Sequence, residues 1–183
     1  MLALLLLSLI PSILAIPYIS LMPVFAKDVL GIGPEGLGIM LAAPGLGAVI
    51  STLFLATFAT RIRHMGRLLL IALTLLGVFL MLFSRTTTLP LALLALMGVG
   101  GFHILLASAT NTTIQQIVPD ALRGRVMSLY MLDVGLAPLG TLVGGVTTQF
   151  FGGPFTVLMM GVLILLFTAV VTWRIPQVRQ LRT

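Results

Sequence analysis

The sequence predicts an all-α membrane protein with six transmembrane helices, and two observations support this. Of its 183 residues, 59% are hydrophobic and 8% are charged, whereas roughly a quarter of the residues in an ordinary soluble domain are charged. Apolar runs of about 20 residues, long enough to cross a bilayer, follow one another along the chain. The charged residues lie almost entirely in the short breaks between these runs.

Three of the expected helices occupy the first half of the chain, at residues 1–26, 36–60 and 68–84. A charged break containing Lys27 and Asp28 follows the first, and a basic segment from Arg61 to Arg67 separates the second from the third. Each run approaches the length that a hydrocarbon core of about 30 Å requires of an α-helix.

The start of the chain admits two other interpretations. Met1–Ala15 is apolar and ends in small residues, as a secretory signal peptide does, but it has no basic amino-terminal segment and the apolar run continues to Ala26. A spanning helix is therefore favoured. The uncharged start also favours an interpretation in which Met1 lies inside a longer protein, so that this chain lacks an amino-terminal six-helix half.

The second half of the chain contains three further expected helices, at residues 88–116, 126–151 and 155–173. The run from Val126 to Trp173 contains one charged residue, Asp133, and is too long for one crossing. Because Gly152-Gly153-Pro154 is typical of a tight turn, we expect two helices to meet there. Residues 1–183 thus form one six-helix transmembrane domain.

Basic residues are distributed unequally between alternate breaks. The breaks after the second and fourth helices, together with the carboxy-terminal tail, contain all but Lys27 and Arg85. Because basic loops stay on the cytoplasmic side, we expect both termini in the cytoplasm and the chain in the inner (plasma) membrane. This clustering also accounts for the net charge of +6 without a nucleic-acid partner. The chain has no cysteine, and we expect neither a metal nor a cofactor.

Two ionisable residues, His103 and Asp133, fall inside the expected helices. A charge at mid-bilayer costs a few kcal/mol even on lenient scales, so such residues often have a function. At about 1.5 Å per residue, Asp133 lies roughly 12 Å from the cytoplasmic edge and His103 roughly 21 Å from the outer edge, which are similar depths. One hypothesis is a proton or cation site. The alternative is that Asp133 bonds nearby hydroxyl groups or reaches the cytoplasmic interface.

A small and polar stripe runs along the expected fourth helix. His103, Ala107 and Asn111 recur at every fourth residue and share a face with Gly100. Since lipid-facing positions are usually apolar, the stripe predicts the lining of a substrate or proton pathway.

Small residues are concentrated in the expected second, fourth and fifth helices, where Gly140-x-x-x-Gly144 has the spacing of a close helix contact. Two interpretations remain open: static tight packing, or smooth faces that let two helix bundles rock against each other. Prolines that permit kinks stand within or near helices at Pro11, Pro17, Pro23, Pro44 and Pro138.

Three hydrophilic segments resemble a known family. Arg61-Ile-Arg-His-Met-Gly-Arg67 is similar to G-x-x-x-D-R-x-G-R-[RK], the motif between the second and third helices of each half in the major facilitator superfamily. Gly66 and Arg67 match its glycine and following base, whereas Arg63 stands at the acidic position. Segments 118–130 and 23–38 resemble the corresponding connections in the branch that contains enterobactin and macrolide-type exporters.

This resemblance covers essentially the whole chain and implies the carboxy-terminal half of a twelve-helix transporter, made of two inverted three-helix repeats. It also implies alternating access in the lipid bilayer, with a missing amino-terminal half or a second copy as partner. The implied activity is proton-coupled export, an antiport, of a small amphipathic solute of the drug or siderophore type.

The resemblance further implies cytoplasmic gating loops that contain Arg61, Arg63, Gly66, Arg67, Asp120, Arg123 and Arg125. The departure at Arg63 argues against an aspartate-based latch in the first loop. Asp120 is well placed to start a helix. Whether it also locks a gate by pairing with a neighbouring arginine, or is simply solvated, is left open.

Enzyme motifs are absent from the sequence, and we expect no catalytic residues. It contains no Gly-x-Ser of an intramembrane serine protease, no H-E-x-x-H and no G-x-x-x-x-G-K-[ST]. An ion gradient is therefore the expected energy source. The alternative function is a six-helix channel, or a membrane subunit of a larger complex without transport activity of its own.

Overall fold

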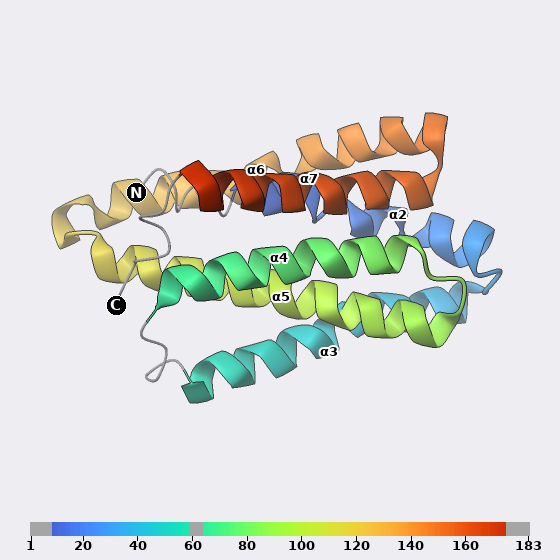
Figure 1. The fold of residues 1–183 in the computed structure, drawn as a ribbon, viewed down its shortest axis with the longest axis horizontal. Coiled ribbons are helices and arrows are strands. Elements are labelled where there is room, and N and C mark those ends of the chain that lie inside the picture. Colours follow the sequence, from blue (N-terminus) through green and yellow to red (C-terminus); the bar gives the residue numbers. More distant parts are fainter. Residues whose placement is uncertain (1–8, 59–63, 175–183) are drawn as a thin grey trace.

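The computed structural model describes residues 9–58 and 64–174, apart from the side chains of residues 121, 123 and 132–134. Every regular element in these ranges is helical, and six of the helices are long and apolar enough to cross a membrane. Figure 1 shows them lying side by side along the long axis of the molecule. The predicted all-α membrane fold with six spanning helices is confirmed.

The first crossing runs from Leu9 to Val29 and contains helix α2 (Tyr18–Val24) and the π-helical turn η1 (Phe25–Val29). The other crossings are α3 (Pro34–Phe58), α4 (Met65–Ser84), α5 (Leu89–Ile117), α6 (Asp120–Phe151) and α7 (Gly153–Arg174). Helix α6 begins at Asp120, the residue expected to start a helix, and its membrane-spanning part is Gly124–Phe151. Its first turn carries the Asp120 carboxylate, which favours the positive end of the helix dipole.

Two prolines interrupt the regular hydrogen bonding of the first crossing. Pro17 has no amide hydrogen, and the next three amides bond to carbonyl groups only three residues back. Pro23 is followed by η1, which closes with the Leu30 amide on the Phe25 carbonyl at 2.9 Å. The helix thus tightens once and widens once along its length.

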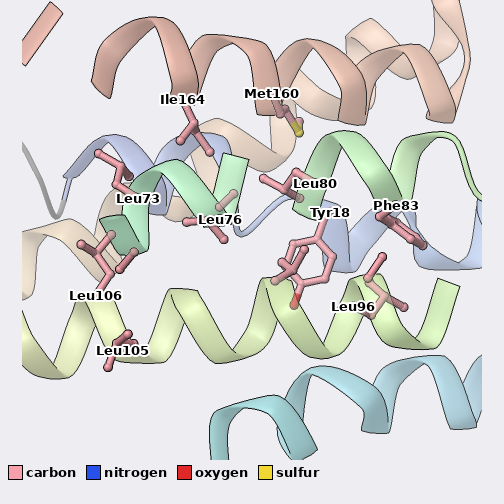
Figure 2. Packing of buried hydrophobic residues seen from close by; sticks show 14 of the residues in the cluster. Tyr18, Leu73, Leu76, Leu80, Phe83, Leu96, Leu105, Leu106, Met160 and Ile164 are labelled. Carbon is pink, nitrogen blue, oxygen red and sulfur yellow. The ribbon is translucent and has the colours of Figure 1, made fainter. Parts of the chain in front are cut away.

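Helix α4 forms the centre of the bundle, with α5 packed on one side and α7 on the other (Figure 1). Its buried side chains recur every three or four residues, at Leu69, Leu73, Leu76, Leu80 and Phe83. Figure 2 shows members of this row together with Met160 and Ile164 of α7 and Leu96 of α5. The rings of Phe83 and Phe25 stack with their centroids 4.4 Å apart, which joins the first crossing to α4.

Helices α3 and α5 meet backbone to backbone. A Cβ atom added to Gly47 would overlap the Met97 carbonyl group, and one added to Gly100 would overlap backbone atoms of Pro44. At Gly101 an added Cβ would lie 3.0 Å from the Gly47 carbonyl oxygen. Because lipid tails are as apolar as leucine, close backbone approach of this kind drives helix association in a membrane.

Two other helix pairs use the same kind of contact. Between α4 and α7, a Cβ atom on Gly161 would come within 2.8 Å of the Gly77 carbonyl oxygen. Between α6 and the first crossing, one on Gly140 would overlap the Ile13 carbonyl group, and Gly144 is also crowded. The predicted Gly140-x-x-x-Gly144 contact is therefore present in the fold.

These contacts follow the symmetry of two related three-helix units. The second helix, α3, packs on the fourth, α5, while the fifth, α6, packs on the first crossing. The first unit consists of the first crossing, α3 and α4, and the second consists of α5, α6 and α7. Exchanging the two units converts the α3–α5 pair into the pair of α6 and the first crossing. The third and sixth helices, α4 and α7, pack on each other, and the exchange leaves that pair unchanged. This is the arrangement that two inverted three-helix repeats require.

Helices α3 and α6 form the two edges of the bundle and expose most of their apolar side chains. On α3 these include Leu46, Val49, Ile50 and Leu53, and on α6 they include Leu139, Leu142, Val143, Val146 and Phe150. No other helix of the described ranges covers these faces. In a bilayer they contact lipid or another polypeptide.

We predict that Gly47→Ala destabilises the bundle and that Gly45→Ala, on the same helix, does not. The added methyl group at Gly47 must push α3 away from the Met97 carbonyl, whereas Gly45 faces open space. Overpacking of this kind costs about 1–3 kcal/mol. The midpoint of thermal unfolding in detergent micelles, followed by circular dichroism, measures the difference. Equal midpoints for the two variants would show that the α3–α5 contact is not tight.

Candidate functional site

His103 lies in the middle of α5, between small and apolar residues. It is the middle residue of this 29-residue helix, with as many residues before it as after it. The imidazole is partly buried. At about 1.5 Å per residue it is roughly 21 Å from either end of the helix, as deep as any residue of α5 lies.

Tyr130 of α6 reaches across to α5 one turn from His103. Its Oη atom donates a hydrogen bond to the Ala107 carbonyl oxygen at 3.2 Å. The phenol is partly buried. A buried phenol normally finds a partner of this kind, and here the partner lies on a different helix.

The Tyr130–Ala107 bond also fixes the relative depth of the two helices. Helices α5 and α6 run in opposite directions, so moving back along α5 and forward along α6 leads to the same membrane depth. His103 is four residues before Ala107 and Asp133 is three residues after Tyr130. These displacements are about 6 Å along α5 and about 4.5 Å along α6, in the same direction. The helix rise therefore predicts similar depths for His103 and Asp133, while the side chain of Asp133 lies outside the described residues.

Thr110 adds a buried hydroxyl group to the same face of α5. It follows His103 by seven residues and Ala107 by three, which places all three on one side of the helix. Its side chain is fully buried, and its Oγ1 atom is the buried side-chain polar atom of the described residues that has no hydrogen-bond partner. The neighbouring Thr113 instead bonds back to the Ala109 carbonyl. An unpaired hydroxyl in a dry interior is costly, which makes Thr110 a candidate for contact with a bound molecule.

Other members of the predicted stripe lie elsewhere. Asn111 is partly buried, and its Oδ1 atom accepts a hydrogen bond from Gln115 on its own helix. Gly100 packs on the backbone of Pro44 and belongs to the α3 contact. His103, Ala107 and Thr110 thus share one side of α5, with Tyr130 bonded to Ala107, and Thr110 and Asn111 each lie about two turns from His103.

The predicted gating residues gather at one end of the bundle. The start of α4, the α5–α6 connection and the end of α7 all lie at the left of Figure 1. Gly66 is buried in the first turn of α4, whereas Arg67, Asp120 and Arg125 are exposed. Arg61, Arg63 and the side chain of Arg123 lie outside the described residues. Arg174, in the last turn of α7, adds another basic residue to this end.

Sequence reasoning missed Tyr130 and Thr110. Tyr130 was visible three residues before Asp133, on the same side of a helix, and tyrosine is rare in this chain, with two in all. Thr110 was visible seven residues after His103. Neither position reveals its partner, because hydroxyl groups in membrane helices most often bond back to their own helix, as Thr113 does here.

The arrangement supplies an imidazole, a phenol and a free hydroxyl in a largely apolar interior. Together these groups can donate and accept hydrogen bonds to the polar part of a solute, and an imidazole can carry a proton near neutral pH. Among the described residues, no group of three His, Cys, Asp or Glu side chains is placed to hold a metal ion.

The chain is similar to one described protein family over nearly its whole length. The model of the transmembrane secretion effectors, a family of the major facilitator type, matches residues 2–182. No curated protein matches the chain.

We predict that Tyr130→Phe weakens the bundle, while Tyr18→Phe leaves it almost unchanged. The first variant removes the bond to Ala107, worth about 1 kcal/mol. For the Tyr18 phenol no hydrogen bond is found in the described ranges. Thermal unfolding of the two variants in the same micelles measures the effect. An unchanged midpoint for Tyr130→Phe would mean that the α5–α6 bond contributes nothing to stability.

Proposed function

We propose that the chain exports a small amphipathic solute by alternating access. This proposal proceeds from the family to which the chain belongs, the transmembrane secretion effectors of the major facilitator superfamily, which makes it a membrane transporter. Proton antiport would drive the export. The substrate would be of the drug or siderophore type, with an apolar body and at least one polar group. The basic end of the bundle would face the cytoplasm of the inner (plasma) membrane.

The observation that carries the proposal is the polar centre of α5. His103 is the one polar side chain in the stretch of α5 from Leu89 to Ala107, with the Tyr130 hydrogen bond at Ala107 and the buried Thr110 hydroxyl just beyond it. Polar groups at this depth reduce the stability of a membrane protein unless they have partners, so they are usually present for a function. A solute with a polar group would satisfy the Thr110 hydroxyl while its apolar part contacts the surrounding leucine and valine side chains.

Proton coupling is supported by the pairing of depths on α5 and α6. From the rise of the two helices that Tyr130 connects, His103 and Asp133 would occupy similar levels. An imidazole ordinarily changes charge near neutral pH, within the range that a transmembrane proton gradient spans, whereas a carboxyl group ordinarily does so at about pH 4. Protonation of either residue would change its charge, and so would change the free energy of opening the bundle to one or the other side of the membrane.

Alternating access requires a second helix bundle, and the two exposed edges suit one. Helices α3 and α6 present apolar faces that the rest of the described bundle leaves uncovered. An amino-terminal six-helix half or a second copy of this chain would cover them. The two bundles would then rock around a site at the level of His103. Arg67, Asp120 and Arg125 would meet the partner at the basic end when that side is closed, with Gly66 allowing close approach.

We predict that His103→Ala removes the pH dependence of transport and that His64→Ala keeps it. His103 is deep in α5, whereas His64 is the other histidine of the chain and precedes the first turn of α4. Liposomes that contain the protein are loaded with ethidium, a lipophilic cation, and a proton gradient is imposed across the membrane. Ethidium movement is followed by fluorescence.

Asp133→Asn provides the second arm of this experiment and should also remove the response to the gradient. If His103→Ala and Asp133→Asn both respond to the gradient as the unmodified chain does, the proton site is not at this level. If the unmodified chain moves no ethidium while co-expression with a second six-helix half restores movement, the chain is a half-transporter. A lack of movement in both cases favours the channel or subunit alternative.

A further inference from the structure

A groove opens between the basic ends of α4 and α7, away from the polar centre of α5. It is lined on α4 by Arg67, Leu70, Ile71, Thr74 and Leu75 and on α7 by Thr172, and its volume is about 550 Å³. The two helices pack directly against each other along their length. The groove therefore lies beside this contact, near the basic end of the bundle.

Its polar features lie at one end. Arg67 is exposed and has no carboxylate partner among the described residues. Next to Thr172, the Trp173 side chain is 78% exposed, and the Arg174 guanidinium lies over its ring, 5.1 Å from the centroid. Exposed tryptophan and arginine at a helix end are typical of the lipid headgroup level. The mouth of the groove is thus at the membrane surface.

The remainder of the groove is apolar and extends into the membrane. From Arg67 to Leu75 is a rise of about 12 Å along α4, close to the thickness of one leaflet, which is half of a core of about 30 Å. The Thr74 hydroxyl donates to the Leu70 carbonyl at 2.8 Å. This wall therefore presents no unpaired donor to an occupant.

The walls of the groove differ from the helix contacts of this chain. Those contacts are made by glycines, such as Gly77 and Gly161 between the same two helices. The groove is instead bordered by Ile71 and Leu75, whose bulk keeps another helix backbone at a distance. A flexible chain with a charged end suits it better than a helix does.

We propose that this groove binds one anionic phospholipid from the leaflet at the basic end. The phosphate group would contact Arg67, and one acyl chain would lie along Leu70, Ile71 and Leu75. A lone exposed arginine binds a free anion weakly, so affinity requires the acyl chain as well as the charge. The groove is separate from the polar residues at the middle of α5, it shares Arg67 with the proposed gate, and its test does not depend on transport.

The test compares lipids and variants by their effect on thermal unfolding in neutral micelles, because a ligand that binds the folded state raises the unfolding midpoint. The probes are phosphatidylglycerol, phosphatidylcholine with matched acyl chains, and inorganic phosphate. For the unmodified chain we expect phosphatidylglycerol to stabilise most and inorganic phosphate to have no effect. If phosphate is as effective as phosphatidylglycerol, the site binds an anion and the lipid proposal is wrong.

Two variants with matched controls locate the site. Arg67→Gln should weaken the apparent affinity for phosphatidylglycerol roughly fivefold and remove the preference over phosphatidylcholine. Arg85→Gln, an exposed arginine at the opposite end of α4, should keep both. Equal losses in the two variants would mean general attraction by positive charge.

A second pair of variants tests the apolar part of the groove independently of the charge on Arg67. Thr74→Phe occupies its apolar part from an exposed position, so it should reduce stabilisation by both phospholipids, whereas Leu82→Phe, exposed outside the groove, should not. Unchanged lipid stabilisation in Thr74→Phe would overturn the proposal, whatever Arg67→Gln shows.

Discussion

Backbone contact at glycines is the interaction on which this bundle depends. Inside a bilayer, apolar side chains gain little by leaving lipid for protein, so helices associate where their backbones can approach closely. The chain supplies such contacts in three helix pairs, represented by Gly47 against Met97, Gly161 against Gly77 and Gly140 against Ile13. Larger side chains then fill the remaining space around α4, which is enclosed by its neighbours. The inverted symmetry of the two three-helix units follows from the same pairs.

The helices that carry the polar residues of the candidate site, α5 and α6, are packed to different extents. Gly100 and Gly101 hold one face of α5 firmly on α3, so the depth of His103 is fixed by a rigid part of the bundle. Helix α6 has far fewer contacts with the other helices than α5 has. Tyr130 links α6 to α5 through a single hydroxyl group. Within the proposed mechanism, α6 is therefore the helix that can move at least cost. A hydrogen bond to a carbonyl oxygen is easily remade after a small shift.

The basic end of the bundle connects the two proposals. Breaks that are far apart in the sequence meet there, because each pair of helices returns the chain to the same end (Figure 1). Arg67 takes part in both, as a gating residue of the transporter and as the phosphate contact of the lipid groove. A lipid phosphate would compete with any carboxylate that approaches Arg67 during the transport cycle. The composition of the surrounding leaflet would then influence the gate.

The sequence by itself determined the helices, because the length and polarity of each run decide whether it can cross a bilayer. Residue spacing also placed His103 and Asp133 at similar depth, since the rise of a helix is constant. Which residues meet was decided by the tertiary structure. Gly45 and Gly47 look alike in the sequence, yet only Gly47 meets another backbone, and nothing local joins Tyr130 to Ala107. Such pairs depend on how each helix is rotated about its axis, and that rotation is set by all of the neighbouring helices together.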